Sequence, residues 1–333
     1  MMSSSEFDLI QRFFTEQSVR RSDVVLGIGD DGALVSPPAG SSLVVSTDTL
    51  ISGVHFPDDT DAHAIGYKTL AVNLSDMAAM GAEPAWISLA ISLPQKDDAW
   101  LARFSRGLFE LAQEFNVQLI GGDTTRGPLS MSVQIIGFVP EGQALKRSGA
   151  QVGDGVFLTG SIGDAGLGLL LKQELKQGLK QASQQAANDS SEFLAKRLEY
   201  PTPRIAAGFA LRELATSAID ISDGLAADLG HVLTASGVGA SIDITRLPLS
   251  SAFRSLATPD DWQSAVSAGD DYELCFTAPM AQESSVLERL QAVDCPCVRI
   301  GEITAHSGLR WYDAENNEQL ISQTGFDHFK GSE

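Results

Sequence analysis

The sequence predicts an α/β protein, α+β in its second half, that folds as two domains over residues 1–150 and 151–333. Its length of 333 residues suits about two domains. Short apolar runs rich in β-branched residues alternate with longer segments of helical periodicity, as in mixed folds. A Gly-Asp-Gly turn at residues 153–155 separates two such series and predicts the boundary near residue 150.

The first domain is expected to alternate helices and strands. Residues 6–15 have apolar side chains at helical spacing, and residues 41–47 predict a strand that ends in Ser46, Thr47 and Asp48. Gly81 and Pro84 are typical helix stops, and they close a helix over residues 61–80. The further elements are a buried strand at 84–93, a helix at 97–115, a short strand at 117–120 that runs into a loop at 121–127, and a strand at 131–139.

The second domain is expected to continue in the same mixed pattern. A strand at 156–159 leads through a glycine-rich segment at 160–168 into a helix. Residues 172–191 are polar and rich in glutamine, and we expect the second half of this segment to be exposed or partly disordered. The remaining elements are helices at 204–214 and from 224 to about 233, and strands at 218–221, 240–244, 272–277 and 298–303.

The composition argues against several classes of function. The formal net charge is −20, from 43 acidic and 23 basic side chains, which disfavours a nucleic-acid partner. No apolar run is long enough to span a membrane and no secretory signal is recognised, so no membrane partner is expected. The three cysteines, Cys275, Cys295 and Cys297, match no zinc or disulfide pattern and suit a reducing cytoplasm.

Carboxylates recur beside glycine or at the ends of expected strands, at Asp30, Asp31, Asp48, Asp76, Asp123, Asp220, Asp223, Asp270 and Asp271. The first pair lies in the turn GIGDDGA at residues 27–33, which by itself is more often an ordinary surface turn. Asp76 instead lies inside an apolar helical segment, three residues after Asn73. So many carboxylates are difficult to stabilise without cations. The pattern therefore predicts several Mg²⁺ ions that hold a nucleoside triphosphate.

Common nucleotide-binding motifs do not occur in the sequence. It has no GxxxxGK[ST] loop and no HRD or DFG set, which argues against P-loop enzymes and protein kinases. Residues 27–32 nearly match GxGxxG, but they carry aspartates where a pyrophosphate would approach, so a Rossmann site is rejected. Arg147 and Arg126 are candidate phosphate contacts because guanidinium groups bind phosphate bidentately, although each can equally be a surface charge.

Together these motifs resemble the thiamine-monophosphate kinase family, whose fold is shared with aminoimidazole ribonucleotide synthetase and selenophosphate synthetase. GIGDDGA or DISDG alone is moderately specific, whereas the whole set is highly specific. The matching stretches follow the family's order over nearly the whole chain: GIGDDGA at 27–33, STDTL at 46–50, HF at 55–56, KTLAVNLSDMAAMG at 68–81, GGDTTRG at 121–127, RSG at 147–149, DISDG at 220–224, DDYELCF at 270–276 and GFDHF at 325–329.

The resemblance implies a cytoplasmic homodimer that transfers the γ-phosphate of ATP to thiamine monophosphate, giving thiamine diphosphate and ADP. It implies an aminoimidazole ribonucleotide synthetase-like fold, in which the N-terminal domain binds ATP and Mg²⁺ and dimerises through its sheet. By motif position, the implied Mg²⁺ ligands are Asp30, Ser46, Thr47, Asp48, Asp76, Asp123, Asp220 and Asp223. The implied ATP contacts are Gly122, Asp123, Arg147 and Ser222, and the implied substrate contacts are His55, Asp270 and Phe326.

The mechanism expected from the sequence is direct in-line transfer. The acceptor phosphate is already largely ionised near neutral pH, so no residue is singled out as a general base or a phosphoryl carrier. Two alternatives stay open. One is another ATP-dependent synthetase of the same fold, for which no catalytic cysteine is found near the start of the sequence. The other is a non-catalytic maturation factor for metalloenzymes, which typically has a C-terminal cysteine tail that this sequence does not show.

Overall fold

The computed structural model describes residues 6–176, 185–257, 262–321 and 325–326. The chain divides into two compact units. Unit 1 comprises residues 1–77 and 82–142, and unit 2 comprises residues 78–81 and 143–333. Each unit has a β-sheet of its own with helices, so the mixed α/β class predicted from the sequence is confirmed.

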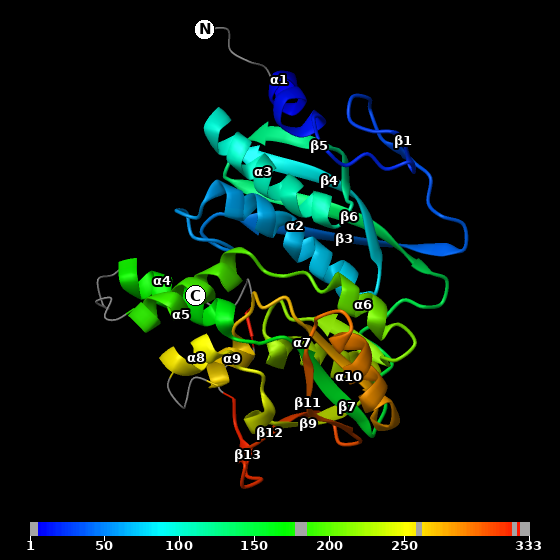
Figure 1. Cartoon of the computed structure of the whole chain (residues 1–333), viewed down its shortest axis with the longest axis vertical. Helices are drawn as coiled ribbons and strands as arrows, with labels where there is room; N and C mark the ends of the chain where they lie inside the picture. Colours follow the sequence, from blue (N-terminus) through cyan, green and yellow to red (C-terminus); the bar gives the residue numbers. More distant parts are fainter. Residues whose placement is uncertain (1–5, 177–184, 258–261, 322–324, 327–333) are drawn as a thin grey trace. The chain divides into compact units, whose positions relative to one another are not determined.

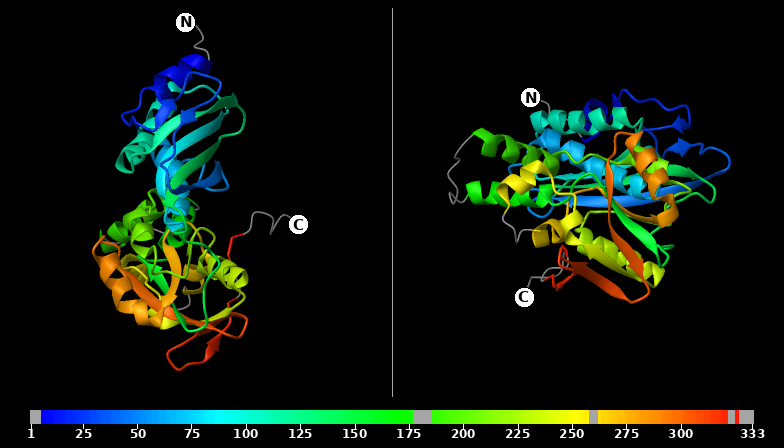
Figure 2. Two further views of the ribbon diagram at one scale, coloured as in Figure 1. Left: turned by 90° about the vertical axis from the view of Figure 1, so that its right-hand side faces the viewer. Right: turned by 60° about the horizontal axis from the view of Figure 1, so that its bottom comes forward.

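Unit 1 is built on a four-stranded sheet with two long helices along one face (Figures 1 and 2). The strand order is β3-β6-β4-β5; β4 and β5 are parallel, and the other neighbours are antiparallel. The bounds are β3 Ser41–Ile51, β4 Glu83–Leu93, β5 Gln118–Arg126, β6 Ser130–Pro140, α2 Ala62–Ala79 and α3 Asp98–Glu114. Both expected helices and the strands expected near 41–47, 84–93 and 131–139 are confirmed.

Helices α2 and α3 contact each other closely at two glycines. A Cβ on Gly66 would overlap the carbonyl oxygen of Phe104, and a Cβ on Gly107 would overlap that of His63. Side chains of both helices, among them Leu74 and Phe104, are fully buried. This close packing fixes α2, which carries Asp76.

The N-terminal part of unit 1 borders the edge strand β5. The helix expected at 6–15 is present as α1 (Glu6–Ile10) followed by a π-helix, η1 (Gln11–Thr15). The Gln17 amide then donates to the Leu119 carbonyl and accepts from the Leu119 N–H, which satisfies the exposed edge of β5. A small hairpin, β1 (Val24–Leu26) with β2 (Leu34–Val35), was not predicted; its residues pack near Trp86.

Unit 2 contains a seven-stranded sheet in the order β13-β12-β9-β11-β7-β10-β8. Its pairs are antiparallel except β12 with β9. The strands are β7 Asp154–Thr159, β8 Ser217–Asp220, β9 Gly239–Asp243, β10 Leu274–Pro279, β11 Cys297–Thr304, β12 Gly308–Tyr312 and β13 Glu318–Gln319. The α-helices are α4 Asp164–Lys176, α5 Gln185–Glu199, α6 Ile205–Leu211, α7 Leu225–Ser236, α8 Ser251–Leu256, α9 Trp262–Ser267 and α10 Glu283–Gln291, and two 3₁₀ turns are η2 Ile244–Arg246 and η4 Met280–Gln282.

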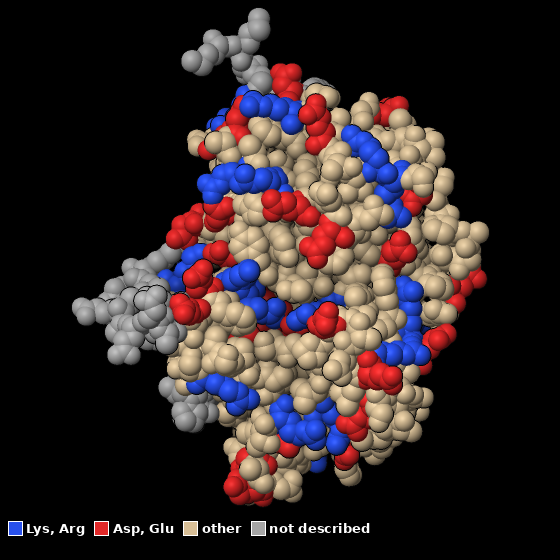
Figure 3. Space-filling view, in the orientation of Figure 1, with Lys and Arg blue, Asp and Glu red and all other residues tan. Residues whose placement is uncertain are grey.

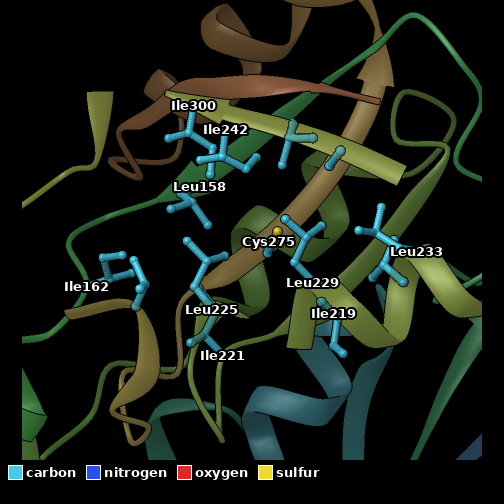
Figure 4. Close-up of a cluster of buried hydrophobic side chains, with 14 of the residues drawn as sticks. Leu158, Ile162, Ile219, Ile221, Leu225, Leu229, Leu233, Ile242, Cys275 and Ile300 are labelled. Atoms are coloured by element: carbon cyan, nitrogen blue, oxygen red, sulfur yellow. The ribbon is translucent and has the colours of Figure 1, made fainter. Parts of the chain in front are cut away.

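The core of unit 2 joins the sheet to helix α7 (Figure 4). Leu225 and Leu229 of α7 are fully buried and face Ile219 of β8 and Cys275 of β10 across this cluster. The packing holds the N-terminal end of α7 next to the end of β8. The loop between them, residues 221–224, therefore starts and ends on rigid elements.

One expectation is wrong. The loop expected at residues 121–127 is largely strand, because β5 continues to Arg126 through its pairing with β4. In the second half of 172–191, which is expected to be exposed or partly disordered, the residues from Gln185 on begin helix α5, and Asp189 is exposed. Residues 177–184 of that segment lie outside the described residues. Helices α8 to α10 and strands β12 and β13 were not predicted.

Charged side chains of both signs are interspersed over the face of the molecule drawn in Figure 3, where they form no single acidic patch. Among the described residues, no helix combines the length and the apolar character needed to cross a lipid bilayer.

Candidate functional site

Strand β3 and helix α2 bring three of the predicted ligands together in unit 1. Successive side chains of a strand point to opposite faces, so Ser46 and Asp48 share one face of β3 and Thr47 lies on the other. The Ser46 hydroxyl donates to Asp76 Oδ2 over 2.5 Å, which identifies the first face as the one that α2 covers. Ser46, Asp48 and Asp76 therefore form one group, which Thr47 can join only through its backbone.

Asp30 and His55 lie in turns that follow strands of unit 1. Asp30 is exposed after β1, and its Oδ1 accepts the N–H of Asp31 over 2.8 Å. The carboxylate that stabilises this turn is thus that of Asp30. His55 follows β3, and its Nδ1 accepts the N–H of Ile51 over 2.9 Å. A neutral His55 ring consequently has its proton on Nε2 and can donate from there.

Strand β5 carries Gly122 and Asp123 in extended pairing with β4. Gly122 has φ +153°, and a Cβ there would overlap the Leu89 carbonyl oxygen and lie 2.7 Å from its carbon. Only glycine fits this position, because both the backbone angle and the close approach of β4 exclude a side chain. The adjacent Asp123 is consequently held at a fixed, exposed place on the sheet.

Asp123 lies on the face of the sheet opposite to Asp48. The register aligns Asp123 with Ala90, Ser132 and Thr49 in turn across the four strands. Aligned residues point to the same side, and Thr49 alternates with Asp48 along β3. Asp123 and Thr49, at the two ends of this row, are three strand spacings apart, which is about 14 Å. Asp48 and Asp123 of one chain therefore cannot bind the same ion.

In unit 2, the loop between β8 and α7 gathers three more predicted residues. Asp220 ends β8 and is buried, and Ser222 and Asp223 follow it and are half-buried. The N–H groups of Ser222 and Asp223 both donate to Asp228 Oδ2, each over 3.0 Å. Asp228, in the first turn of α7, thus holds the loop residues that precede the helix.

The carboxylates around this loop repel one another. Burial, together with the nearby charges of Asp220 and Asp223, raises the pKa of Asp228 to about 8, against the two backbone hydrogen bonds that lower it. Asp228 is not among the residues predicted from the sequence. Its place in the first turn of the helix that follows DISDG is the signal that could have indicated a structural role.

The same loop also holds the predicted substrate contacts Asp270 and Phe326. The N–H of Asp270 donates to the Ser222 carbonyl over 2.9 Å, and the N–H of Phe326 donates to the Asp223 carbonyl over 3.0 Å. Five predicted residues from distant parts of the sequence therefore meet in unit 2 through hydrogen bonds of one loop: Asp220, Ser222, Asp223, Asp270 and Phe326.

Arg147 lies apart from this group within unit 2. The Ser236 hydroxyl, at the C-terminal end of α7, donates to the Arg147 carbonyl and accepts the N–H of Gly149. Ser222 precedes the other end of α7, so about 18 Å of helix separates the two positions. The Arg147 side chain is exposed, and among the described residues it has no ion-pair partner. Arg126, in unit 1, donates to the Pro94 carbonyl, at 3.4 Å.

The predicted metal ligands are aspartate, serine and threonine residues, which bind metals through oxygen atoms. Oxygen ligands suit hard cations such as Mg²⁺. Within the described residues, no group of three or more His, Cys, Asp and Glu side chains is arranged to hold a metal ion by itself. Mg²⁺ usually binds through one or two carboxylates and completes its shell with water and phosphate oxygens. The residues therefore fit a cation that is bound together with a phosphate ligand.

Comparisons with known proteins extend the similarity over both units. Two family models match: AIR synthase related protein, N-terminal domain, over residues 29–139, and AIR synthase related protein, C-terminal domain, over residues 151–313. The thiamine-monophosphate kinase of Escherichia coli (strain K12) is 47% identical over 331 residues, covering 98% of this chain and 99% of the relative.

Solved structures agree with this result. The crystal structure of thiamine-monophosphate kinase from Stenotrophomonas maltophilia K279a has a TM-score of 0.81 at 49% identity, covering 87% of this chain and 92% of that one. AaThiL complexed with AMPPCP and TMP has a TM-score of 0.75 at 29% identity, covering 91% and 92%. The similarity thus includes a structure solved with two ligands bound.

Proposed function

The chain belongs to the thiamine-monophosphate kinase family, and we propose that it transfers the γ-phosphate of ATP directly to the phosphate of thiamine monophosphate, giving thiamine diphosphate and ADP. The relative with 47% identity over nearly the full length is a kinase of this substrate. Another synthetase reaction and a maturation role are therefore not favoured.

The observation that carries this proposal is the hydrogen-bonded loop of unit 2. Ser222, the expected ATP contact, accepts through its carbonyl from Asp270, the expected contact of thiamine monophosphate. Phe326, a second expected substrate contact, is joined to the neighbouring Asp223. In-line transfer needs the donor and acceptor phosphates side by side in a fixed orientation. One loop that contacts both substrates supplies this proximity.

The carboxylates of both units are proposed to hold Mg²⁺. Mg²⁺ held there would neutralise the negative charge on the transferred phosphoryl group. In unit 1 the Ser46–Asp76 hydrogen bond fixes one carboxylate before any ion binds. In unit 2 the hydrogen bond from the Asp223 N–H to Asp228 Oδ2 fixes the backbone that carries Asp223. The proposed ligands are Asp30, Ser46, Thr47, Asp48, Asp76, Asp123, Asp220 and Asp223, and Gly122, Asp123, Arg147 and Ser222 are the proposed ATP contacts.

No protein nucleophile is needed in this reaction. The acceptor phosphate is already an anion near neutral pH, so positioning and charge neutralisation suffice. Burial raises the pKa of Cys295 to about 11 and that of Cys297 to about 12, so both thiols stay protonated and are poor phosphoryl carriers. We therefore infer that no phospho-enzyme forms.

The thiamine end of the substrate is proposed to contact three groups. The neutral His55 ring can donate from Nε2. The Phe326 ring is 50% exposed and can stack on a cationic thiazolium or on the pyrimidine, with a cation–π contribution. Asp270 offers a carboxylate to the polar edge of the pyrimidine.

We also propose a homodimer that forms through the sheet of unit 1. The side of β3 that α2 does not cover exposes the apolar side chains Val45 and Ile51, of which Val45 is 55% exposed. Exposed apolar groups on a sheet typically mark an interface. Asp123 lies on this same side, away from Asp48. A second copy would cover the apolar side chains and lie against Asp123, so its own residues could complete that ion site.

The proposed location is the cytoplasm, where ATP is available and the three cysteines stay reduced. Within the described residues all three are free thiols.

Incubation of the purified protein with ATP, Mg²⁺ and thiamine monophosphate tests the function. We expect stoichiometric thiamine diphosphate and ADP, with little turnover when thiamine replaces thiamine monophosphate. Asp223→Asn should abolish product, and Asp189→Asn, which changes an exposed acid of α5, should leave the rate unchanged. ATP consumption without thiamine diphosphate, or equal rates for both variants, would contradict the proposal.

A further inference from the structure

The loop that carries Asp270 has an unusual backbone. Asp270 has φ +68° and Tyr272 has φ +50°, so two residues other than glycine adopt the left-handed conformation on either side of Asp271. An aromatic residue in this region is strained, and such residues persist only where their surroundings determine them strongly. The loop is therefore held by specific contacts, which can be identified.

Hydrogen bonds of Asp271 and its neighbours to other residues of unit 2 hold this backbone in place. The buried carboxylate of Asp271 accepts the N–H of Gly163 over 2.9 Å with both oxygens. Its carbonyl accepts from Arg197 Nη2, of helix α5, over 3.3 Å. The N–H of Tyr272 donates to the Ile221 carbonyl over 2.8 Å. Four hydrogen bonds thus hold the residues next to Asp270 in place.

Glu273 holds the C-terminal side of the same loop. It is fully buried, and its carboxylate accepts from Arg204 at 2.7 and 2.5 Å, from Arg197 at 2.9 Å and from the Thr159 hydroxyl at 2.7 Å. Arg197 therefore contacts both Asp271 and Glu273. A carboxylate between two guanidinium groups in a buried place has little freedom to move.

Within this loop, the Tyr272 hydroxyl donates to Asp270 Oδ1 over 3.0 Å. The ring of Tyr272 is buried, whereas Asp270 is half-buried. A hydrogen bond from a fixed, buried phenol gives a partly exposed carboxylate one preferred orientation.

We propose that Tyr272 is a positioning residue, which acts through Asp270 to preset the contact with thiamine monophosphate. This inference rests on the proposed function and extends it to a residue that contacts Asp270 rather than the substrate. Tyr272 therefore contributes to the binding of thiamine monophosphate and not to that of ATP.

Tyr272→Phe tests the inference, because it removes one hydroxyl and keeps the buried ring. We expect the KM for thiamine monophosphate to rise about tenfold, as for the loss of a hydrogen bond to a charged group, while kcat and the KM for ATP stay within about twofold. Tyr312→Phe, in strand β12, is the matched control and should leave all three constants unchanged. The melting temperature of each variant separates positioning from folding.

A double-mutant cycle shows whether Tyr272 acts through Asp270. In an Asp270→Ala background, Tyr272→Phe should have no further effect on the KM for thiamine monophosphate. An additive effect, or an unchanged KM in the single Tyr272→Phe variant, would overturn the inference while wild-type turnover still supported the proposed function. A wild type that does not phosphorylate thiamine monophosphate would overturn both.

Discussion

Replacement of Gly122 by alanine is expected to damage unit 1 at the predicted ATP contact. Its φ of +153° is rarely adopted by residues with a side chain, and such a conformation costs about 1–3 kcal/mol. A Cβ would also overlap the Leu89 carbonyl and lie 2.7 and 2.9 Å from the carbon and nitrogen of that residue. These are backbone atoms of a central strand, which cannot move aside as a side chain would.

We expect the Gly122→Ala variant to lose about 3 kcal/mol of unfolding free energy, as the conformational cost and the forced separation of β4 and β5 act together. This corresponds to a fall of roughly 10 °C in melting temperature. The KM for ATP should rise as well, because Asp123 shifts with the strand. Denaturant unfolding monitored by circular dichroism, with initial rates at varied ATP, measures both effects.

The adjacent Gly121 provides a matched control. A Cβ there would meet nothing within 4 Å, and its φ is not positive. Gly121→Ala should therefore change the unfolding free energy by less than about 0.5 kcal/mol. Equal destabilisation by the two substitutions would refute the reasoning, since it would show that the effect comes from the loss of a glycine and not from the contact with Leu89.

Three further predictions concern carboxylates of the two units. Asp76→Asn should abolish activity at saturating Mg²⁺ with little change in melting temperature, because an amide can still accept from Ser46; near-normal turnover would remove Asp76 from the metal ligands. Glu273→Gln should lower the unfolding free energy by about 3–5 kcal/mol in urea, since Arg197 and Arg204 lose a buried counter-charge, and a loss below about 1 kcal/mol would contradict this. Burial raises the pKa of Asp271 well above 3.8, so the folded chain retains a proton that the unfolded chain releases, and stability should fall as pH rises above about 4. Asp271→Asn should flatten this fall in pH-dependent unfolding, and an unchanged slope would count against it.

The parts of the fold that follow from local pattern were predicted well. The helix near 61–80 has a long apolar periodicity with Gly81 and Pro84 as its stop, and the structure has α2 at Ala62–Ala79. The segment at 121–127 shows the opposite case. Its Gly-Gly-Asp composition is typical of a loop, but pairing with β4 extends β5 through it. That pairing is a tertiary effect, which single-sequence propensities do not contain.

In the candidate site, too, local patterns predict some features, and others depend on tertiary structure. Asp220 at a strand end and Ser222 after it could be identified from the sequence, because the apolar run before them predicts the strand. That Thr47 and Asp48 point to opposite faces follows from strand alternation alone. The separation of Asp48 from Asp123 required the register of four strands. The hydrogen bond from Tyr272 to Asp270 joins two left-handed residues, which no residue pattern here indicated.

The fate of the γ-phosphate of ATP distinguishes direct transfer from transfer through the protein. The protein is incubated with ATP labelled in the γ-phosphate, Mg²⁺ and thiamine monophosphate, and the label is followed in the product and in the protein. Direct transfer predicts that all transferred label appears in the terminal phosphate of thiamine diphosphate and that none is bound to protein incubated with ATP alone. Label on the protein, or release of labelled inorganic phosphate without thiamine diphosphate, would contradict direct transfer.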